Sequence, residues 1–228
     1  MMHRINRRRF LASLAALAGG LMAQKKPLEN LSLGMSRPRD PRLPPGQRWV
    51  EELIEYSAGG RAAIDEKEWR FTLDGLVDKP LSYSLEEFRA LPHVDLAADF
   101  HCVTTWSVKD APWRGVRLND LLKMAGIKAE ARFVFAECYG GYSTNFPLET
   151  ARRPDVLLAD GYRGNPLPRM FGGPIRLVVP SLYAYKSAKW VNRILLLDAD
   201  RRGFWEENGY SNFADPWKEQ RHTGDDRT

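Results

Sequence analysis

A lone cysteine at the end of an apolar strand constrains this chain more than any other feature. A two-residue period places the thiol of Cys102 on the buried face of that strand and turns His101 to the opposite face. The hydroxyl groups and the indole ring of residues 103–107 surround the sulfur, and such a setting suits a thiolate ligand of a soft metal. A buried free cysteine is also an ordinary small hydrophobe, and the pattern fits both interpretations. The apolar residues that share its parity are Val94, Leu96, Ala98 and Phe100.

Short apolar segments recur along the chain and predict further β-strands. They are bounded by turn residues, as at 164–166, and we expect the polar turn that follows Cys102 to end at Gly115. Because strands outnumber helices and no internal repeat occurs, we predict a mixed α+β domain built on β-sheets, with short helices at its edges. The additional strands are expected at residues 69–75, 132–136, 156–159, 175–179 and 190–197.

Two short helices have recognisable ends. Ser84 and Glu87 form a capping box, which predicts a helix that stops before the next proline. Asn119 or Asp120 can cap a second helix that Gly126 closes. The apolar face of this second helix consists of Leu118, Leu121, Leu122 and Ala125.

The first residues carry the pattern of an export signal. Arg7-Arg8-Arg9 precedes a short apolar run and a small-residue end at Ala23, as in a twin-arginine leader read by the Tat export machinery. The run is shorter than the ~20 apolar residues of a spanning helix, so we expect a periplasmic protein without a permanent anchor. We divide the chain into a signal peptide (1–23), an extended, surface-running arm (24–47), a central domain (48–200) and an aromatic-rich C-terminal tail (201–228) that packs on the domain.

Charge and cysteine content exclude several protein classes. Residues 1–23 hold four of the 34 basic side chains and none of the 29 acidic ones, so the remainder is nearly neutral and we expect no nucleic-acid function. The two cysteines, Cys102 and Cys138, form no Cys-x-x-Cys and therefore no zinc ribbon; a single bridge between them is compatible with an oxidising periplasm. No Cys-x-x-Cys-His occurs, so no covalently attached haem is expected in this chain.

Several motifs occur in the order of a known family. The segments HCVTTWS (101–107) and APWRGV (111–116) precede a Leu-rich helix, and GFWEENGY (203–210) leads to DPWKEQR (215–221). Together they resemble the molybdopterin-binding domain of the sulfite oxidase superfamily, in particular the small bacterial sulfite-oxidase-like oxidoreductases and the periplasmic methionine-sulfoxide reductase catalytic subunit. The resemblance runs from about Trp69 to Asp198 and implies a molybdenum–molybdopterin cofactor with Cys102 as the metal ligand.

The resemblance also assigns further site residues. Tyr142, in the glycine-rich turn expected at 140–147, matches a catalytic tyrosine that stands near the metal and donates a hydrogen bond or a proton; a tyrosine packed by its ring fits the same turn. A guanidinium, ammonium groups and backbone N–H groups can hold the phosphate and polar edges of a pterin, whereas a solvated basic loop is the other interpretation of this segment. The implied cofactor-binding residues are Cys138, Arg169, Arg176, Lys186, Ser187, Ala188 and Lys189.

The chain departs from the family at two places. Residues 104–107 are uncharged where sulfite oxidases carry arginines that bind the sulfite anion, and Phe171 replaces a polar histidine or asparagine. We therefore expect an exported oxidoreductase that transfers an oxygen atom and two electrons at a small sulfur or nitrogen oxide. The substrate would be a small-molecule or peptidyl oxide, and a membrane haem subunit or c-type cytochrome the electron partner.

Three other functions remain open on the sequence. Sulfite oxidation is the nearest, a cysteine hydrolase using Cys102 is a second, and an exported, non-enzymatic binding domain is the third. His101 cannot be the base of such a hydrolase, because adjacent side chains of a strand diverge. The aromatic segment 203–221 either docks a partner or covers an open edge of the domain.

Overall fold

The computed structural model of the chain describes residues 40–56 and 60–226. The predicted leader (1–23) and most of the predicted arm lie outside these residues. Within the described part, no helix is long and apolar enough to cross a membrane. Strands outnumber helices, and the predicted α+β class is confirmed.

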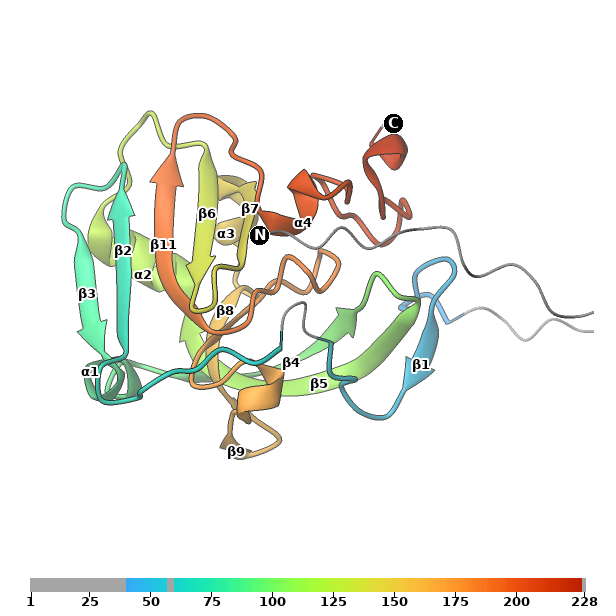
Figure 1. Ribbon diagram of the computed structural model, residues 1–228, viewed down its shortest axis with the longest axis horizontal. Helices are drawn as coiled ribbons and strands as arrows, with labels where there is room; N and C mark the ends of the chain where they lie inside the picture. Colours follow the sequence, from blue (N-terminus) through green and yellow to red (C-terminus); the bar gives the residue numbers. More distant parts are fainter. Residues whose placement is uncertain (1–39, 57–59, 227–228) are drawn as a thin grey trace, which may run out of the picture. The chain divides into compact units, whose positions relative to one another are not determined.

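One sheet has five strands in the order β3-β2-β11-β6-β7, and these lie side by side in Figure 1. β2 and β11 run parallel, whereas the other neighbours are antiparallel. Phe71 and Leu73 of β2 are fully buried, as their two-residue period predicts. The strands are β2 (Arg70–Gly75), β3 (Leu81–Ser84), β6 (Phe133–Cys138), β7 (Ser143–Pro147) and β11 (Val191–Leu197).

The second sheet is organised around its longest strand, β5. Its order is β1-β5-β8-β10, with β4 paired to β5 and β9 paired to β8. The β4–β5 hairpin ends in the turn that carries Cys102, so this strand pair positions the predicted metal ligand. The strands are β1 (Arg48–Val50), β4 (Val94–His101), β5 (Trp106–Arg117), β8 (Leu157–Tyr162), β9 (Asn165–Pro166) and β10 (Arg176–Val178).

Short helices lie beside the sheets. The Ser84–Glu87 capping box is present at the start of α1, and Gly126, at a φ of 70°, ends α2 as predicted. The N-cap of α2 is Arg117, without a side-chain hydrogen bond, so the prediction of Asn119 or Asp120 as its cap is wrong. The helices are α1 (Leu85–Arg89), α2 (Leu118–Ala125), α3 (Leu148–Ala151), α4 (Phe204–Glu207) and the 3-10 helices η1 (Arg169–Phe171) and η2 (Thr223–Asp225).

The buried side chains form two large clusters, because the strands of the second sheet are covered on both faces. Leu158 and Leu177 belong to the cluster that includes the buried face of the five-stranded sheet. Cys102 belongs to the other cluster, with Trp106, Trp113 and their neighbours. The sheet around β5 therefore separates the two apolar cores.

Three local predictions are corrected. The turn after Cys102 does not reach Gly115: it spans only the next residues, and 106–117 form strand β5. The glycine-rich turn at 140–147 ends earlier, since 143–147 form β7. The described end of the arm, 40–47, consists of turns rather than extended chain, because it holds three prolines and a glycine with a positive φ.

Candidate active site

The turn between β4 and β5 presents Cys102 to a cavity. The Thr105 N–H donates to the Cys102 carbonyl at 3.1 Å, and the Cys102 N–H donates to the Trp106 carbonyl at 2.8 Å. Thr105 adopts a φ of 73°, which closes the turn tightly. The Cys102 sulfur lies 3.1 Å from the hydroxyl of Thr104, and burial raises the pKa of its thiol.

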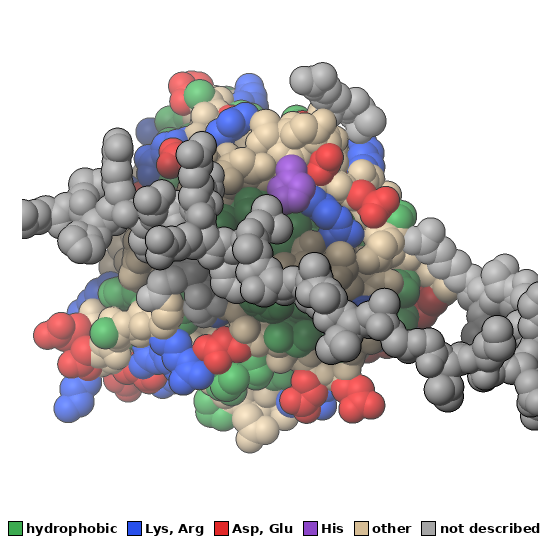
Figure 2. Space-filling view, turned by 45° about the vertical axis from the view of Figure 1, so that its right-hand side comes forward, with side chains coloured by type: hydrophobic (Ala, Val, Ile, Leu, Met, Phe, Trp, Pro, Cys, Tyr) green, Lys and Arg blue, Asp and Glu red, His purple; other side chains and the backbone are tan. Residues whose placement is uncertain are grey.

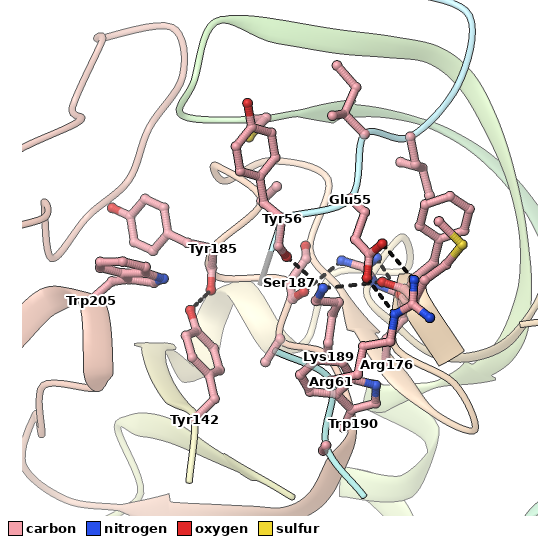
Figure 3. A pocket seen from close by; sticks show the side chains of 18 of the residues that line it. Glu55, Tyr56, Arg61, Tyr142, Arg176, Tyr185, Ser187, Lys189, Trp190 and Trp205 are labelled. Carbon is pink, nitrogen blue, oxygen red and sulfur yellow. Dashed lines mark hydrogen bonds and ion pairs between the residues drawn. The ribbon is translucent and has the colours of Figure 1, made fainter. Parts of the chain in front are cut away.

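The cavity has a volume of about 600 Å³. Side chains from the segment before β2, the Cys102 turn, the loop after β6, the loop before β11 and the C-terminal tail line it. Figure 3 shows two groups of these side chains on opposite sides of the view. We call Glu55, Arg61, Arg176 and Lys189 the charged end. The aromatic end consists of Tyr142, Tyr185 and Trp205, together with Tyr210, whose ring packs against those of Tyr185 and Trp205.

Arg176 is the most deeply buried cation of the charged end. Its guanidinium donates to the carbonyls of Phe171 (2.8 Å), Ser187 (2.8 Å) and Leu177 (3.3 Å) and lies against two aromatic rings. None of the carboxylates in the described residues pairs with it, and burial lowers its pKa to about 10. A buried cation with only neutral partners has unused N–H donors and uncompensated charge, so it suits an anionic ligand.

Two further cations lie at the charged end. Lys189 donates to the carbonyls of Tyr56 (2.6 Å) and Met170 (3.2 Å), and burial together with the charge of Arg176 lowers its pKa to about 8. Arg61 forms a bidentate pair with Glu55, at 2.8 and 2.9 Å. The charged end therefore holds three cationic side chains and one carboxylate, so it favours an anion.

The aromatic end carries no formal charge. The Tyr142 hydroxyl donates to the Tyr185 carbonyl at 2.5 Å, and the rings of Tyr185, Trp205 and Tyr210 pack with centroid distances of 4.8 to 5.3 Å. Burial, and then the charge of Glu206, raise the pKa of Tyr142 well above its usual value. Tyr142 is therefore a phenol, and hence a hydrogen-bond donor, across the physiological pH range.

The predicted pterin-binding residues are only partly brought together. Ser187, Ala188, Arg176 and Lys189 line the cavity; the Ser187 hydroxyl accepts from the Val179 N–H at 2.9 Å. Phe171 also lines it, and the carbonyl rather than the ring of Phe171 bonds to Arg176.

Lys186, Cys138 and Arg169 are not among the cavity-lining residues. The ammonium of Lys186 is buried elsewhere, 2.6 Å from the Glu206 carboxylate, because a charge removed from water needs a partner. Cys138 lies in the other apolar core, and Arg169 donates to the Ile64 carbonyl. The expectation that the side chain of Lys186 faces the cofactor site is corrected.

Neither a disulfide nor a catalytic dyad is formed at Cys102. Both cysteines are free thiols, which corrects the option of a bridge between them: Cys102 and Cys138 belong to different cores. Of the described histidines none lines the cavity, and His101 faces away, with its Nδ1 2.8 Å from the Ser107 hydroxyl. The cysteine hydrolase is therefore not supported, because the thiol has neither a base nor a lowered pKa.

Sequence reasoning missed several cavity residues. Trp205 and Tyr210 were expected either to dock a partner or to cover an open edge, and α4, which contains Trp205, does contact the edge strand β7. The high aromatic content of the tail was visible in the sequence, but the position of these rings beside Tyr142 was not.

Figure 2 shows hydrophobic side chains gathered in a hollowed part of one face, with charged side chains around it.

The residues of the cavity fit a molybdopterin. The charged end supplies a buried guanidinium that pairs with none of the described carboxylates, which suits a phosphate, and Cys102 supplies a thiol of the soft type that binds molybdenum. Among the described residues, no cluster of His, Cys, Asp and Glu could hold a metal by protein ligands alone. A metal here would need further ligands, and a pterin would bring them.

Comparisons with known proteins agree with this fit. Residues 58–205 match the oxidoreductase molybdopterin binding domain. The chain is 39% identical over 185 residues to YuiH of Bacillus subtilis, an uncharacterized oxidoreductase, across 81% of this chain and 93% of the relative. It is 30% identical to MsrP of Campylobacter jejuni, a protein-methionine-sulfoxide reductase catalytic subunit, across 71% of this chain but only 62% of MsrP.

A solved structure is also similar. The sulfane dehydrogenase SoxCD from Paracoccus pantotrophus superimposes with a TM-score of 0.58 and 27% sequence identity. The match covers 64% of this chain and 42% of the SoxCD chain. The fold around the cavity is therefore one that a known oxidoreductase shares.

Proposed function

We propose that this chain, which belongs to the oxidoreductase molybdopterin binding domain family of the sulfite oxidase superfamily and is a molybdenum-dependent oxidoreductase, reduces the oxide of a small sulfur or nitrogen centre. The observation that carries the proposal is the uncharged aromatic end of the cavity. All lysine and arginine side chains among the described cavity residues are Arg61, Arg176 and Lys189, at the charged end. A substrate at the aromatic end therefore meets rings and hydroxyl groups and need not be an anion.

Four residues would hold the cofactor at the charged end. Arg176 and Lys189 would pair with its phosphate, and the backbone of Ser187 and Ala188 would contact its polar edges. When bound, the cofactor supplies the two-electron oxygen-transfer chemistry that no side chain of the protein can supply. Arg61 would either leave Glu55 and pair with the same phosphate, or keep its pair with Glu55 and remain as a nearby positive charge.

Cys102 would bind molybdenum as a thiolate. Because burial raises the pKa of its thiol, the proton must leave when the metal binds, and the 3.1 Å contact with the Thr104 hydroxyl can then stabilise the thiolate. The tight turn keeps the sulfur at the cavity surface.

Tyr142 would orient the substrate oxygen. Its raised pKa makes it a poor acid but a constant hydrogen-bond donor, and its hydroxyl has only to leave the Tyr185 carbonyl to reach a ligand. Reduction of a sulfoxide consumes two electrons and two protons and gives a thioether and water. Because Tyr142 would hold its own proton, the two protons would come from solvent.

The cellular setting is part of the proposal. The relative MsrP is named as the catalytic subunit of a reductase, which supports a separate electron partner such as a membrane haem subunit or a c-type cytochrome. The twin-arginine pattern at Arg7-Arg8 supports export to the periplasm.

The test is a substrate screen on the loaded protein. The full chain is purified from a host that makes molybdopterin, its molybdenum is measured, and sulfoxides, N-oxides and sulfite are assayed with an artificial electron carrier. We expect reduction of neutral oxides and little oxidation of sulfite; Cys102→Ser, prepared in parallel, should show neither. Sulfite oxidation faster than reduction of every oxide would refute the proposed direction and substrate class.

A further inference from the structure

Two side chains donate hydrogen bonds to the Cys102 turn, one from a residue that precedes it in the sequence and one from a residue that follows it. The Gln47 amide donates to the Cys102 carbonyl at 3.1 Å, and the Arg221 guanidinium donates to the Val103 carbonyl at 2.5 Å. These carbonyls belong to adjacent residues, and the cysteine is one of them. We call Gln47 and Arg221 the clasp.

Both members of the clasp are themselves held in place. The Ser107 hydroxyl donates to the Gln47 amide oxygen at 3.2 Å, and the same hydroxyl contacts His101. The Arg221 guanidinium lies 4.9 Å from the centre of the Tyr183 ring. Its side chain is only 16% exposed, so little rotamer freedom is left to it.

Arg221 is also connected to Gln47 through the backbone. Its guanidinium is 3.5 Å from the Pro45 carbonyl, and the Gln47 N–H donates to the Pro44 carbonyl at 3.3 Å. The two donors are therefore linked to each other through residues 44–47 as well as through the turn. A shift of the tail would be transmitted both to the turn and to the segment before β1.

The clasp lies outside the residues that match the family model. The family match spans residues 58–205, whereas Gln47 precedes it and Arg221 follows it. The turn that the clasp holds is strained, because Thr105 is a β-branched residue at a φ of 73°. Such a conformation persists only where its surroundings determine it.

We propose that Gln47 and Arg221 are positioning residues that hold the turn so that the Cys102 sulfur faces the cavity. The inference rests on the proposed role of Cys102 as a metal ligand. Outer hydrogen bonds that fix a metal ligand commonly change metal affinity by about 10–100-fold when removed. Neither clasp residue touches the cavity, so their effect passes through the turn.

The first experiment measures thiol access in the full chain made without molybdopterin. Cys102 and Cys138 are labelled with a thiol reagent and distinguished by mass spectrometry. Gln47→Leu removes one donor without changing charge, and Arg221→Lys keeps the positive charge but loses the fork that reaches both Val103 and Pro45. We expect the double variant to label Cys102 at least about tenfold faster than wild type, with each single variant in between.

Cys138 serves as the internal control. It is 7% exposed in a different core, so general loosening of the fold would accelerate its labelling as well. We expect its rate to stay unchanged in the clasp variants. Arg153→Lys is the matched control: among the described residues the Arg153 guanidinium pairs only with nearby Asp155, so this variant should leave both rates unchanged.

The second experiment measures molybdenum and pterin per chain after expression with the cofactor pathway. We expect the double variant to retain about a tenth of the wild-type metal or less. Wild-type labelling and wild-type metal content in the double variant would overturn the inference, as would equal acceleration of Cys102 and Cys138. Should the double variant not fold, Gln47→Leu decides alone, and no change in its Cys102 rate refutes the clasp. A failure of the proposed oxide reduction would instead appear only as wrong substrates for a fully loaded wild-type protein.

Discussion

Removal of Glu206 alone should strongly destabilise the protein, whereas removal of Glu206 and Lys186 together should not. The Lys186 ammonium lies 2.6 Å from the Glu206 carboxylate, both side chains are fully buried, and the ammonium also donates to Asn145 at 2.9 Å. Glu206 accepts from Thr144 at 2.7 Å, and its second oxygen has no hydrogen-bond partner among the described residues. The pair connects the C-terminal tail, which contains Glu206, to the loop before β11, which contains Lys186.

The magnitude follows from this geometry. Glu206→Leu leaves a buried ammonium with one neutral partner, and breaking such a pair typically costs about 3–5 kcal/mol. In the double variant Lys186→Met/Glu206→Leu both charges are gone; such replacements are neutral or stabilising by about 1–4 kcal/mol. Against this, Thr144 and Asn145 each lose a partner, at about 1–3 kcal/mol per group. Thr144 loses its partner in both variants, so only the loss at Asn145 is specific to the double variant. At the middle of these ranges we therefore expect the double variant to be about 4 kcal/mol more stable than Glu206→Leu.

Urea unfolding of the cofactor-free protein measures these differences as a double-mutant cycle. For a domain of this size, 3–5 kcal/mol corresponds to a fall in Tm of about 6–20 °C. Lys123→Met, which breaks the exposed pair with Asp120, is the control and should not move the midpoint measurably. A cost below about 1 kcal/mol for Glu206→Leu would show that water reaches the pair and would refute the reasoning.

Four further predictions concern the site and the leader. Cys102→Ser should fold normally but lose turnover and metal, because a hydroxyl is a harder and less acidic ligand of similar size; wild-type turnover would contradict its role. Lys189→Glu should lower pterin content at least about tenfold, since a charge-assisted contact of about 1.5–3 kcal/mol is replaced by repulsion, and unchanged pterin fluorescence after denaturation would remove Lys189 from the site. With a pKa of about 8, Lys189 is charged below and neutral above that pH, so the ratio of cofactor affinity between wild type and Lys189→Met should fall as the pH rises through about 8, while the proton released from Cys102 affects both proteins equally. Replacing Arg7-Arg8 by Lys-Lys should keep the precursor in the cytoplasm, which cell fractionation tests, because the pair is read by a receptor rather than as charge alone.

Local patterns in the sequence predicted the elements whose cause is local. The capping box at Ser84 and the apolar face of α2 depend on residues within one or two turns of a helix, and both are confirmed. Strand β5 was missed because Pro112 and Gly115 resemble turn residues, although the strand tolerates them next to register shifts. The type of a single residue does not show whether its segment pairs with another strand.

The site was predictable only where side chain and neighbour lie close in sequence. The two-residue period placed Cys102 on the buried face of its strand, and the family resemblance assigned Arg176 and Lys189, which line the same cavity. The partner of Lys186 comes from the tail, and a sequence pattern could not tell an ammonium facing a pterin from one facing Glu206. Long-range packing decided that question.

The residues that line the cavity come from different parts of the chain, so translation produces them in a fixed order. A ribosome that has completed residue 200 has already produced Cys102, Arg176 and Lys189, but neither Trp205 and Tyr210 nor Arg221. Domains fold as their residues emerge, N-terminal parts first. Trp205 and Tyr210 complete the aromatic end that Tyr142 and Tyr185 begin, so this end of the cavity is finished only after every residue of the charged end has been synthesised.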